Sequence, residues 1–566
     1  MNATKSARSS IRYLCLAGLL AVLAAAYSYF GATQTYAQGQ SLLEGKITSS
    51  GGAAVAAIPV RAQRANSNIT VSVYTNSRGE YSFPAWSDAT PGTYAVSVQL
   101  PDFERVTREG VALAAGRTTR VDLTLQPRQP TLADATATDI VMALPGTDEQ
   151  KHLFIQCDNC HSLQWALKNP HTREEWGQIV RKMAGRRGNL EKPGTKTFGQ
   201  KQYLDPLADY LTSIRGPGSS DQIPFRLRPR PTAEASTRIV VTEYDIPRGG
   251  PHDIYTIRRD LRYAWPHDII MDENYAYYTD HYSPYFGRLN KKTGEVKEYR
   301  YAMPQRAGRE GAAAGGMGEG GTHDIMWDSQ KRVVFGMGGA TLRFDPRTEQ
   351  FVSWPSGGGM FGMDPQDGVW SVRDEGELSR LDTRTGAVKE YKLPAVDGIY
   401  DHEVDSQGRS IINVWDEAKF RLFDPKTEKF TDYPTPTPQS GPRRGDMDSK
   451  DRQWLGLYWA GRLAMFDPNK GEVKEYSLIP DSKPFGPPFP APYSAAVDDK
   501  NQFVWTSDFN SSRIYRFDMK TEKTTEYFTP LPYEVRDLTV DKTAQRPTVW
   551  IPAYRPPSKM VKIQMY

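Results

Sequence analysis

The sequence has few cysteines, no long hydrophobic run beyond one near its N-terminus, and no excess of charge of one sign. Only 3 of its 566 residues are cysteine, which excludes a disulfide-dense scaffold. Lys and Arg number 71 against 67 Asp and Glu, for a formal net charge of +4, and no basic block marks a nucleic-acid or anionic-lipid surface. The chain is instead rich in Tyr, Trp, Gly and Pro. Such a composition is typical of many short strands joined by tight turns.

Residues 1–37 have the layout of a secretory signal peptide. Lys5, Arg8 and Arg12 form a basic start, an apolar run follows over 14–26, and Thr35-Tyr36-Ala37 resembles a cleavage site. The apolar run is short for an uncleaved anchor. Cleavage removes three positive charges and no acid, which leaves a net charge of about +1 (4 − 3). We therefore expect export to the bacterial periplasm or beyond, with no integral membrane segment in the mature chain.

The segment Cys157-Asp158-Asn159-Cys160-His161 has the C-x-x-C-H spacing of a c-type haem attachment site. Two thiols add to the haem vinyl groups, and the adjacent imidazole lies where it can ligate the iron. The alternatives are a chance match and a C-x-x-C redox pair. Cys15, the remaining cysteine, lies in the signal segment. We predict one covalent haem c, bound by Cys157 and Cys160, with His161 as the proximal iron ligand.

The sequence constrains the second axial ligand of the iron less closely than it does the proximal ligand. Met183 shares a predicted helix face with Trp176 and Val180, similar to small c-type domains with a short distal loop. Met183 is therefore the predicted distal ligand, although a methionine at helical spacing also fits an ordinary core. His171 and an open sixth position are the alternatives. His152 precedes the motif and is expected at the surface.

The N-terminal module is predicted over 38–127. Short segments alternate polar and apolar residues and are separated by turn signals, which indicates a small antiparallel sandwich. Gly45, the run 76–83 and Pro91-Gly92-Thr93-Tyr94 resemble the carboxypeptidase regulatory-like domain. The resemblance implies an immunoglobulin- or transthyretin-like β-sandwich with a carbohydrate-binding-like fold. No zinc-peptidase ligand set accompanies it, so a spacer or docking role is favoured over sugar binding.

The middle of the chain is predicted to be a small all-α cytochrome c domain over 146–218, between linkers at 128–145 and 219–238. Thr172-Arg173-Glu174-Glu175 is a capping-box pattern that opens a helix. A last amphipathic helix carries Leu204, Leu207 and Leu211 before Gly216-Pro217-Gly218 ends it.

The region 239–566 contains a repeat of roughly 35–55 residues, which indicates a propeller. Six copies have a turn like Phe423-Asp424-Pro425-Lys426-Thr427 followed by a polar-aromatic strand. A seventh is split between the C-terminal strands and the strand 239–246, so that the first strand pairs with the last and closes the ring. The pattern resembles the seven-bladed virginiamycin B lyase-like propellers. The predicted fold class is thus multidomain and mainly β.

Polar residues recur where each predicted inner strand begins, and should ring one mouth of the central channel. Asp268, Asp324, Asp401 and Asp537 repeat, as braces between blades would, whereas site residues should not repeat. The candidate catalytic residues are His323, His402, Glu403, Arg443 and Arg536. Lyases of the resembled superfamily use a His and Glu set with a divalent metal. That set does not map onto this chain, so a propeller metal has no sequence support.

These features favour a haem protein that transfers electrons to or from a periplasmic donor or acceptor. The propeller would bind or oxidise a small molecule of unknown identity. The alternatives are a metal-dependent lyase or hydrolase at the propeller mouth with an accessory haem, and a non-catalytic binding scaffold.

Overall fold

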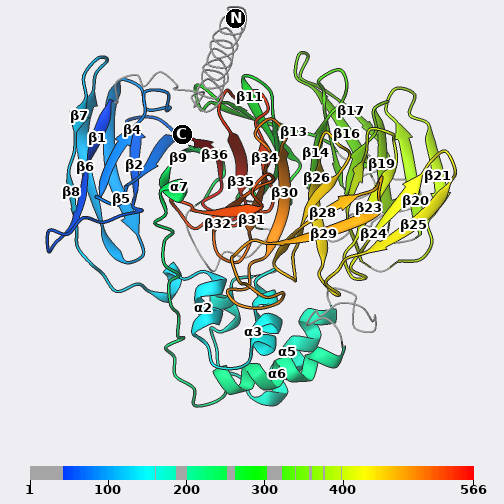
Figure 1. Ribbon diagram of the computed structural model, residues 1–566, viewed down its shortest axis with the longest axis horizontal. Helices are drawn as coiled ribbons and strands as arrows, with labels where there is room; N and C mark the ends of the chain where they lie inside the picture. The colour runs from blue at the N-terminus through cyan, green and yellow to red at the C-terminus, as the bar shows by residue number, and fades with distance from the viewer. Residues whose placement is uncertain are drawn as a thin grey trace, which may run out of the picture.

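The computed structural model describes residues 42–159, 161–185, 201–250, 260, 262–302, 321–337, 340–355, 360–373, 376–396 and 398–566. The predicted signal peptide and Cys160 lie outside these residues. The protein is mainly β, with three parts (Figure 1): a sandwich of strands on the left, a ring of sheets in the centre and right, and a group of helices below.

The N-terminal part, called here the sandwich, contains two sheets that enclose one apolar core. Burial alternates along the first strand, so that Leu43 and Ile47 enter the core. Gly45 stands where a Cβ would lie 1.8 Å from the Val121 carbonyl oxygen, so no other residue fits there. The strands are β1 (Leu43–Ser49), β2 (Pro59–Arg64), β3 (Ile69–Tyr74), β4 (Glu80–Phe83), β5 (Gly92–Leu100), β6 (Phe103–Leu113), β7 (Thr119–Arg120) and β8 (Leu123–Leu125).

The helices that follow form a second core, and this group is called the helical module. Its elements are η1 (Leu132–Asp134), α2 (Ala137–Ala143), α3 (Asp148–Ile155), η2 (Gln156–Asn159), α4 (Leu163–Ala166), α5 (Arg173–Gly185) and α6 (Lys201–Arg215). The predicted capping box is present, because Thr172 N–H donates to Glu175 and Glu175 N–H donates to Thr172 Oγ1. No helix within the described ranges is long and apolar enough to cross a membrane.

The stretch 128–145, expected to be a linker, instead contains helix α2. Thr136 and Asp139 form its capping box, and Ile140 and Val141 are fully buried in the helical core. The run of small residues before them hides this short helix from a periodicity analysis. In the second expected linker, 219–238, Arg228 donates to Glu526 of the propeller, and the short helix α7 (Glu234–Thr237) precedes the first propeller strand.

The third part, called the propeller, consists of repeated four-stranded antiparallel sheets. Its first three sheets are β10 (Pro266–Met271), β11 (Tyr275–Asp280), β12 (Tyr285–Asn290), β13 (Val296–Arg300); β14 (Asp324–Trp327), β15 (Val333–Met337), β16 (Ala340–Asp345), β17 (Gln350–Trp354); and β18 (Phe361–Met363), β19 (Gly368–Arg373), β20 (Glu377–Asp382), β21 (Val388–Lys392). The next three are β22 (Ile399–Val404), β23 (Ser410–Val414), β24 (Lys419–Asp424), β25 (Lys429–Pro434); β26 (Pro442–Met447), β27 (Gln453–Leu457), β28 (Arg462–Asp467), β29 (Glu472–Ser477); and β30 (Pro492–Asp498), β31 (Phe503–Asp508), β32 (Arg513–Asp518), β33 (Lys523–Phe528).

The seventh sheet joins the two ends of the propeller and continues into the sandwich. It contains β34 (Thr539–Val540), β35 (Thr548–Ala553), β36 (Lys559–Met565) and β9 (Ile239–Asp245). β36 pairs with β9 along its whole length, with Lys559 opposite Asp245 and Met565 opposite Ile239, so the predicted pairing of first and last strands is present. The other edge of β9 pairs with β3. One eight-stranded sheet therefore runs from the propeller into the sandwich.

The closing strand yields a test of the propeller's independence. We expect a fragment of residues 231–566 to be monomeric and to unfold cooperatively, because it keeps β9 and can close the ring. A matched fragment of residues 249–566 lacks β9, leaves the edge of β36 unpaired and should aggregate. Size-exclusion chromatography and thermal unfolding distinguish the two, and identical behaviour of both fragments would show that ring closure does not require β9.

Candidate functional site

The helical module encloses a cavity of about 350 Å³ between α3, α4, α5 and α6. Cys157 and His161 of the C-x-x-C-H segment line it, and so do both predicted distal residues, Met183 and His171. Most of the remaining wall is apolar. The structure therefore brings every described residue of the predicted haem set to one cavity, while Cys160 lies outside the described residues.

His161 is oriented within this cavity by its neighbours. Its Nδ1 lies 3.3 Å from the Ser162 carbonyl oxygen, and its ring is 4.6 Å from that of Trp165. A contact between Nδ1 and a carbonyl oxygen is the kind that orients an imidazole for ligation through Nε2. The cavity thus combines a mainly apolar wall with one oriented imidazole.

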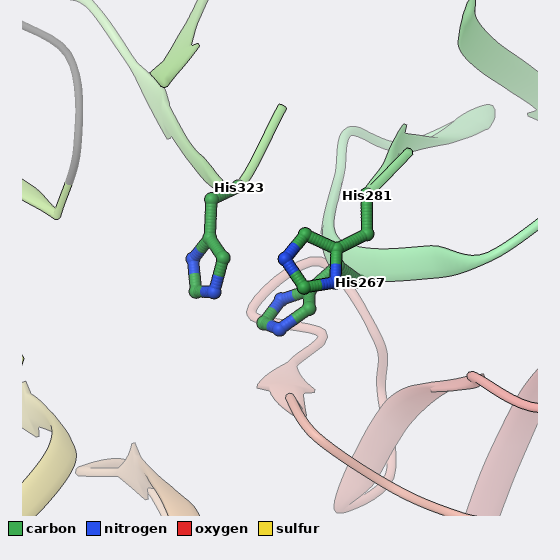
Figure 2. Close-up of side chains that lie close together, drawn as sticks. All are labelled: His267, His281 and His323. Atoms are coloured by element: carbon green, nitrogen blue, oxygen red, sulfur yellow. The ribbon is translucent and has the colours of Figure 1, made fainter. Parts of the chain in front are cut away.

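A second cluster of candidate residues lies in the propeller, at the end of the central channel where the inner strands begin. This end is called the mouth. His267 lies in β10, His281 directly follows β11, and His323 directly precedes β14. All three are buried, and Figure 2 shows their imidazole rings gathered together. The His267 ring centroid is 3.7 Å from that of His323 and 4.6 Å from that of His281.

The Nδ1 atom of each imidazole has a polar partner. The His267 Nδ1 lies 3.0 Å from Asp268, and the His323 Nδ1 lies 3.1 Å from Asp324. The His281 Nδ1 lies 2.6 Å from the Tyr554 hydroxyl. Burial lowers the pKa of His323 to about 4 and that of His267 well below its usual value. Both rings are therefore neutral at neutral pH.

Arg444 lies beside these histidines and connects their carboxylates. It pairs with Asp268, and its Nη2 donates to Asp324 at 2.7 Å. Burial favours protonation of Asp324, but the Arg444 guanidinium outweighs burial and holds the pKa of that carboxyl below its ordinary value. Burial has the larger effect on Asp268, whose pKa is raised well above its ordinary value although it shares the same guanidinium.

Arg443 points into a box of aromatic rings at the same mouth. Its guanidinium carbon lies 3.6 to 4.7 Å from the ring centroids of Tyr400, Trp415, Tyr458 and Tyr493. Its Nη2 donates to the Tyr400 hydroxyl, but its Nε and Nη1 are buried without a hydrogen-bond partner. No carboxylate within the described part of the chain forms an ion pair with it. A buried cation with unused donors can bind an anion.

Tyr493 connects the arginines to the histidines. Arg443 and Arg536 both lie over its ring, and its hydroxyl is 3.5 Å from the His267 Nε2. Burial alone would raise the pKa of Tyr493, but the two guanidinium groups outweigh burial and lower it. Arg536 also pairs with Glu534 at 2.9 Å. The predicted residues His323, Arg443 and Arg536 are therefore neighbours around Tyr493 and His267.

The other two predicted catalytic residues do not join this group. The His402 Nε2 lies 2.5 Å from the Ser410 hydroxyl on the adjacent strand, and no contact within the described residues joins His402 to the three histidines. Burial, followed by repulsion from Asp401, raises the pKa of Glu403 well above its usual value. This shift favours the protonated, neutral form of the Glu403 carboxyl.

The repeated aspartates connect neighbouring blades. Asp324 accepts the Phe361 N–H at 2.7 Å, and Asp401 accepts the Gly445 N–H at 3.0 Å. Asp537 similarly accepts an N–H from the first strand of the next blade. Asp268 differs, since it binds Arg444 and His267. The repeating positions thus act as braces, and Asp324 serves both the brace and the site.

The helical module packs on the propeller at this mouth. The Tyr458 hydroxyl, in the connection between β27 and β28, donates to Asn159 at 2.8 Å. His152, expected at the surface, is buried with its Nε2 3.2 Å from the Trp459 carbonyl oxygen. The sequence of one helix does not indicate that a second domain covers its polar side. Asn159 belongs to the C-x-x-C-H segment, so that segment directly contacts Tyr458, one of the four aromatic residues around Arg443.

His281 and Tyr458, which lie at the mouth, were not among the residues predicted to be catalytic. His281 lies at the end of a second strand, and Tyr458 lies at the end of another. In four-stranded blades the second strand ends at the mouth where the first strand begins. Comparing the start of the first strand and the end of the second strand in every repeat would have identified them.

The burial of His402 predicts a dependence of stability on pH. The pKa of His402 is lowered to about 3 by burial, whereas an unfolded histidine titrates near 6.5. Between pH 6.5 and 4.5 the unfolded chain therefore takes up a proton that the folded chain refuses, and the folded state loses about 2 kcal/mol from this residue. His402→Gln should show a correspondingly smaller loss in denaturant titrations at the two pH values.

Val352→Thr is the control, because this side chain is exposed on the propeller surface and carries no titrating group. It should retain the wild-type pH dependence. Equal pH dependence in wild type and His402→Gln would contradict the assignment of His402 as a buried, neutral imidazole.

Comparisons with known proteins agree with the N-terminal module. Residues 43–126 match the family model of the carboxypeptidase regulatory-like domain. No curated protein matches the chain. A streptogramin B lyase structure is 17% identical, with 59% of this chain and 100% of that chain covered at a TM-score of 0.47. Virginiamycin B lyase from Staphylococcus aureus is 15% identical, with 54% of this chain and 96% of that chain covered at a TM-score of 0.44. The WD40 repeats of RRP9 are 10% identical, with 54% of this chain and 95% of that chain covered at a TM-score of 0.44. The chain thus carries a carboxypeptidase regulatory-like domain, followed by a propeller defined by its own strand pairing.

Proposed function

We propose that this chain is an exported c-type haem protein that exchanges electrons between a small anionic molecule at the propeller mouth and a separate redox partner. The observation that carries the proposal is the contact between Tyr458 and Asn159. It joins the C-x-x-C-H segment to the aromatic box of Arg443 by one hydrogen bond of 2.8 Å. The predicted haem site and the polar mouth are therefore adjacent.

The helical module supplies groups suited to haem c. Cys157, with Cys160, would form the thioethers, and His161 and Met183, which both line the cavity, would ligate the iron. Bound haem c supplies reversible one-electron transfer. The apolar wall excludes water around it, and the contact of His161 Nδ1 with Ser162 fixes the ring that faces the cavity.

The mouth supplies groups suited to an anion. Arg443 is 6% exposed, lacks a carboxylate partner in the described chain and has two unused donor atoms. A substrate carboxylate or comparable oxyanion would satisfy both donors, as planar guanidinium groups do. Tyr493 and Tyr458 contact this guanidinium and lie between the histidines and Asn159, so they line the shortest connected route from the mouth to the haem segment.

The sandwich supports a docking role. Its strand β3 pairs with β9, and Arg61 forms an ion pair with Glu243 of the propeller at 2.5 Å. These contacts stabilise one arrangement of the sandwich relative to the propeller, as a docking role requires.

The proposal is tested first by the haem spectrum and then by its reduction. Purified exported protein should retain one haem per chain after acidic acetone extraction, and Cys157→Ala with Cys160→Ala should abolish this retention. Under anaerobic conditions, one pool of small organic acids should reduce the haem. Arg443→Met should slow that reduction by at least about 100-fold, because a charged hydrogen bond contributes roughly 1.5–3 kcal/mol and the site holds two.

Arg347→Met is the matched control, because this guanidinium is exposed on the propeller surface. It should leave reduction unchanged. A protein without covalent haem would contradict the proposal outright. A haem that accepts electrons only from a chemical reductant would contradict the role of the mouth and favour a carrier or scaffold.

The distal ligand is tested separately by the haem reduction potential. Met183→Ala should lower the potential by about 0.1 V or more, since a thioether ligand raises it and axial ligands set potentials over roughly 0.8 V. His171→Ala should leave the potential near the wild-type value. The reverse pattern in a spectroelectrochemical titration would identify His171 as the ligand.

A further inference from the structure

The three histidines at the mouth form a site that the proposed haem function does not use. We propose that His267, His281 and His323 together bind one divalent first-row transition-metal ion through their Nε2 atoms. The three come from separate segments that the propeller brings together, and one ligand atom from each lies within 4.8 Å of the others. Figure 2 shows the three rings gathered together.

The hydrogen bonds of the Nδ1 atoms determine which nitrogen is available. Asp324 already accepts hydrogen bonds from Arg444 and from the Phe361 N–H, and it can accept a third from the Nδ1–H of His323. Asp268 likewise accepts a hydrogen bond from Arg444, and it lies 3.0 Å from the His267 Nδ1. In a neutral imidazole the other nitrogen, Nε2, then holds the lone pair that a metal requires. Metal-ligating histidines in proteins have this arrangement, with the second nitrogen bonded to a carboxylate or comparable group.

The partner of the His281 Nδ1 is a hydroxyl group in place of a carboxylate. This Nδ1 lies 2.6 Å from the Tyr554 hydroxyl oxygen, which can accept a hydrogen bond from the ring N–H. The Tyr493 hydroxyl lies 3.5 Å from the His267 Nε2. A contact of that length is weak, and a metal–nitrogen bond of about 2.0–2.1 Å would replace it readily.

Carboxylates and guanidinium groups both surround the cluster. Arg444 pairs with Asp268 and Asp324, and Glu534 pairs with Arg536 at 2.9 Å and with Arg555 at 2.8 Å. The proposal therefore rests on the positions of the three imidazoles and not on the charge around them.

The ligand set indicates the class of metal. Three neutral imidazoles suit Zn²⁺, Cu²⁺, Fe²⁺ or Ni²⁺ rather than Mg²⁺ or Ca²⁺, which prefer oxygen. One ring nitrogen of each histidine already lies within 4.8 Å of the others, so small ring movements would bring three nitrogens to bonding distance from a common centre. Three protein ligands also leave a position open for water or an exogenous molecule, as in catalytic rather than structural sites. The alternative set of Asp268, Asp324 and His323 is less suitable, because Arg444 occupies both carboxylates.

The test uses the full-length protein after dialysis against a chelator, with Zn²⁺ and Cu²⁺ added separately. Iron is counted separately by elemental analysis, so that loss of haem and loss of this site are distinguishable. The wild type should bind one ion per chain with a micromolar or lower Kd in chelator competition. Electron paramagnetic resonance of the Cu²⁺ form should show coupling to three imidazole nitrogens.

Variants then identify the ligands. His267→Ala, His281→Ala and His323→Ala should each weaken Zn²⁺ binding by about 100-fold or more. Tyr554→Phe, which keeps the ring but removes the partner of His281, should weaken it by about 10- to 100-fold. His402→Ala is the matched control, a buried propeller histidine outside the cluster, and should bind as the wild type does.

Three results would overturn the proposal. One is a wild type that binds neither ion more tightly than millimolar. Another is Cu²⁺ whose spectrum shows fewer than three nitrogens, a measurement that does not depend on the variants folding. The last is undiminished binding in folded His323→Ala, with folding judged by thermal unfolding, because this would place the ion elsewhere.

Discussion

The pairing of β9 on both of its edges is the constraint on which the rest of the molecule depends. β9 completes the last blade through β36 and simultaneously extends the sandwich through β3. A strand so placed has no unpaired edge, so one strand both closes the ring and joins the sandwich to it. The seventh blade is thus the point at which two domains share one hydrogen-bonded sheet.

This shared sheet also restricts the helical module. The module lies in the chain between β8 and β9, so both of its ends are attached to a single rigid body. Attachment at both ends reduces the conformational entropy lost when the helices pack on the mouth, since the ends are already close to their final positions. The contacts of His152 with Trp459 and of Asn159 with Tyr458 can then select one orientation, although each is a single hydrogen bond.

Sequence patterns predicted the parts of this protein more completely than their arrangement. The turn repeat and the strand at 239–246 predicted a ring closed by its first and last strands, because strand pairing follows from local patterns. The contact between β3 and β9 depends on matching edges of two domains, and nothing in either strand alone indicates it. Helix α2 was missed for a related reason, since Ile140 and Val141 are its only strongly apolar buried residues.

The candidate site was predicted in part for the same physical reason. His323, Arg443 and Arg536 begin inner strands or precede them, and residues at equivalent positions of a ring must converge. His402 and Glu403 lie further along their strand, where side chains face either the neighbouring strand or a set of carboxylates. His281 was missed because it lies at the end of a second strand, whose convergence on the same mouth becomes evident only when whole blades are aligned.

The energetic cost of the mouth is itself informative. Burying the Arg443 guanidinium with two donors unsatisfied is unfavourable by several kcal/mol, and interactions with four aromatic rings return only part of that. A hub built for stability alone would place apolar side chains there, as replacement of buried ions by apolar residues is often stabilising. Asp324 shows the difference, since its carboxylate satisfies a backbone N–H, an imidazole and Arg444 at once. Arg443 has no comparable partner within the described chain, and an anionic ligand is the simplest group that would complete it.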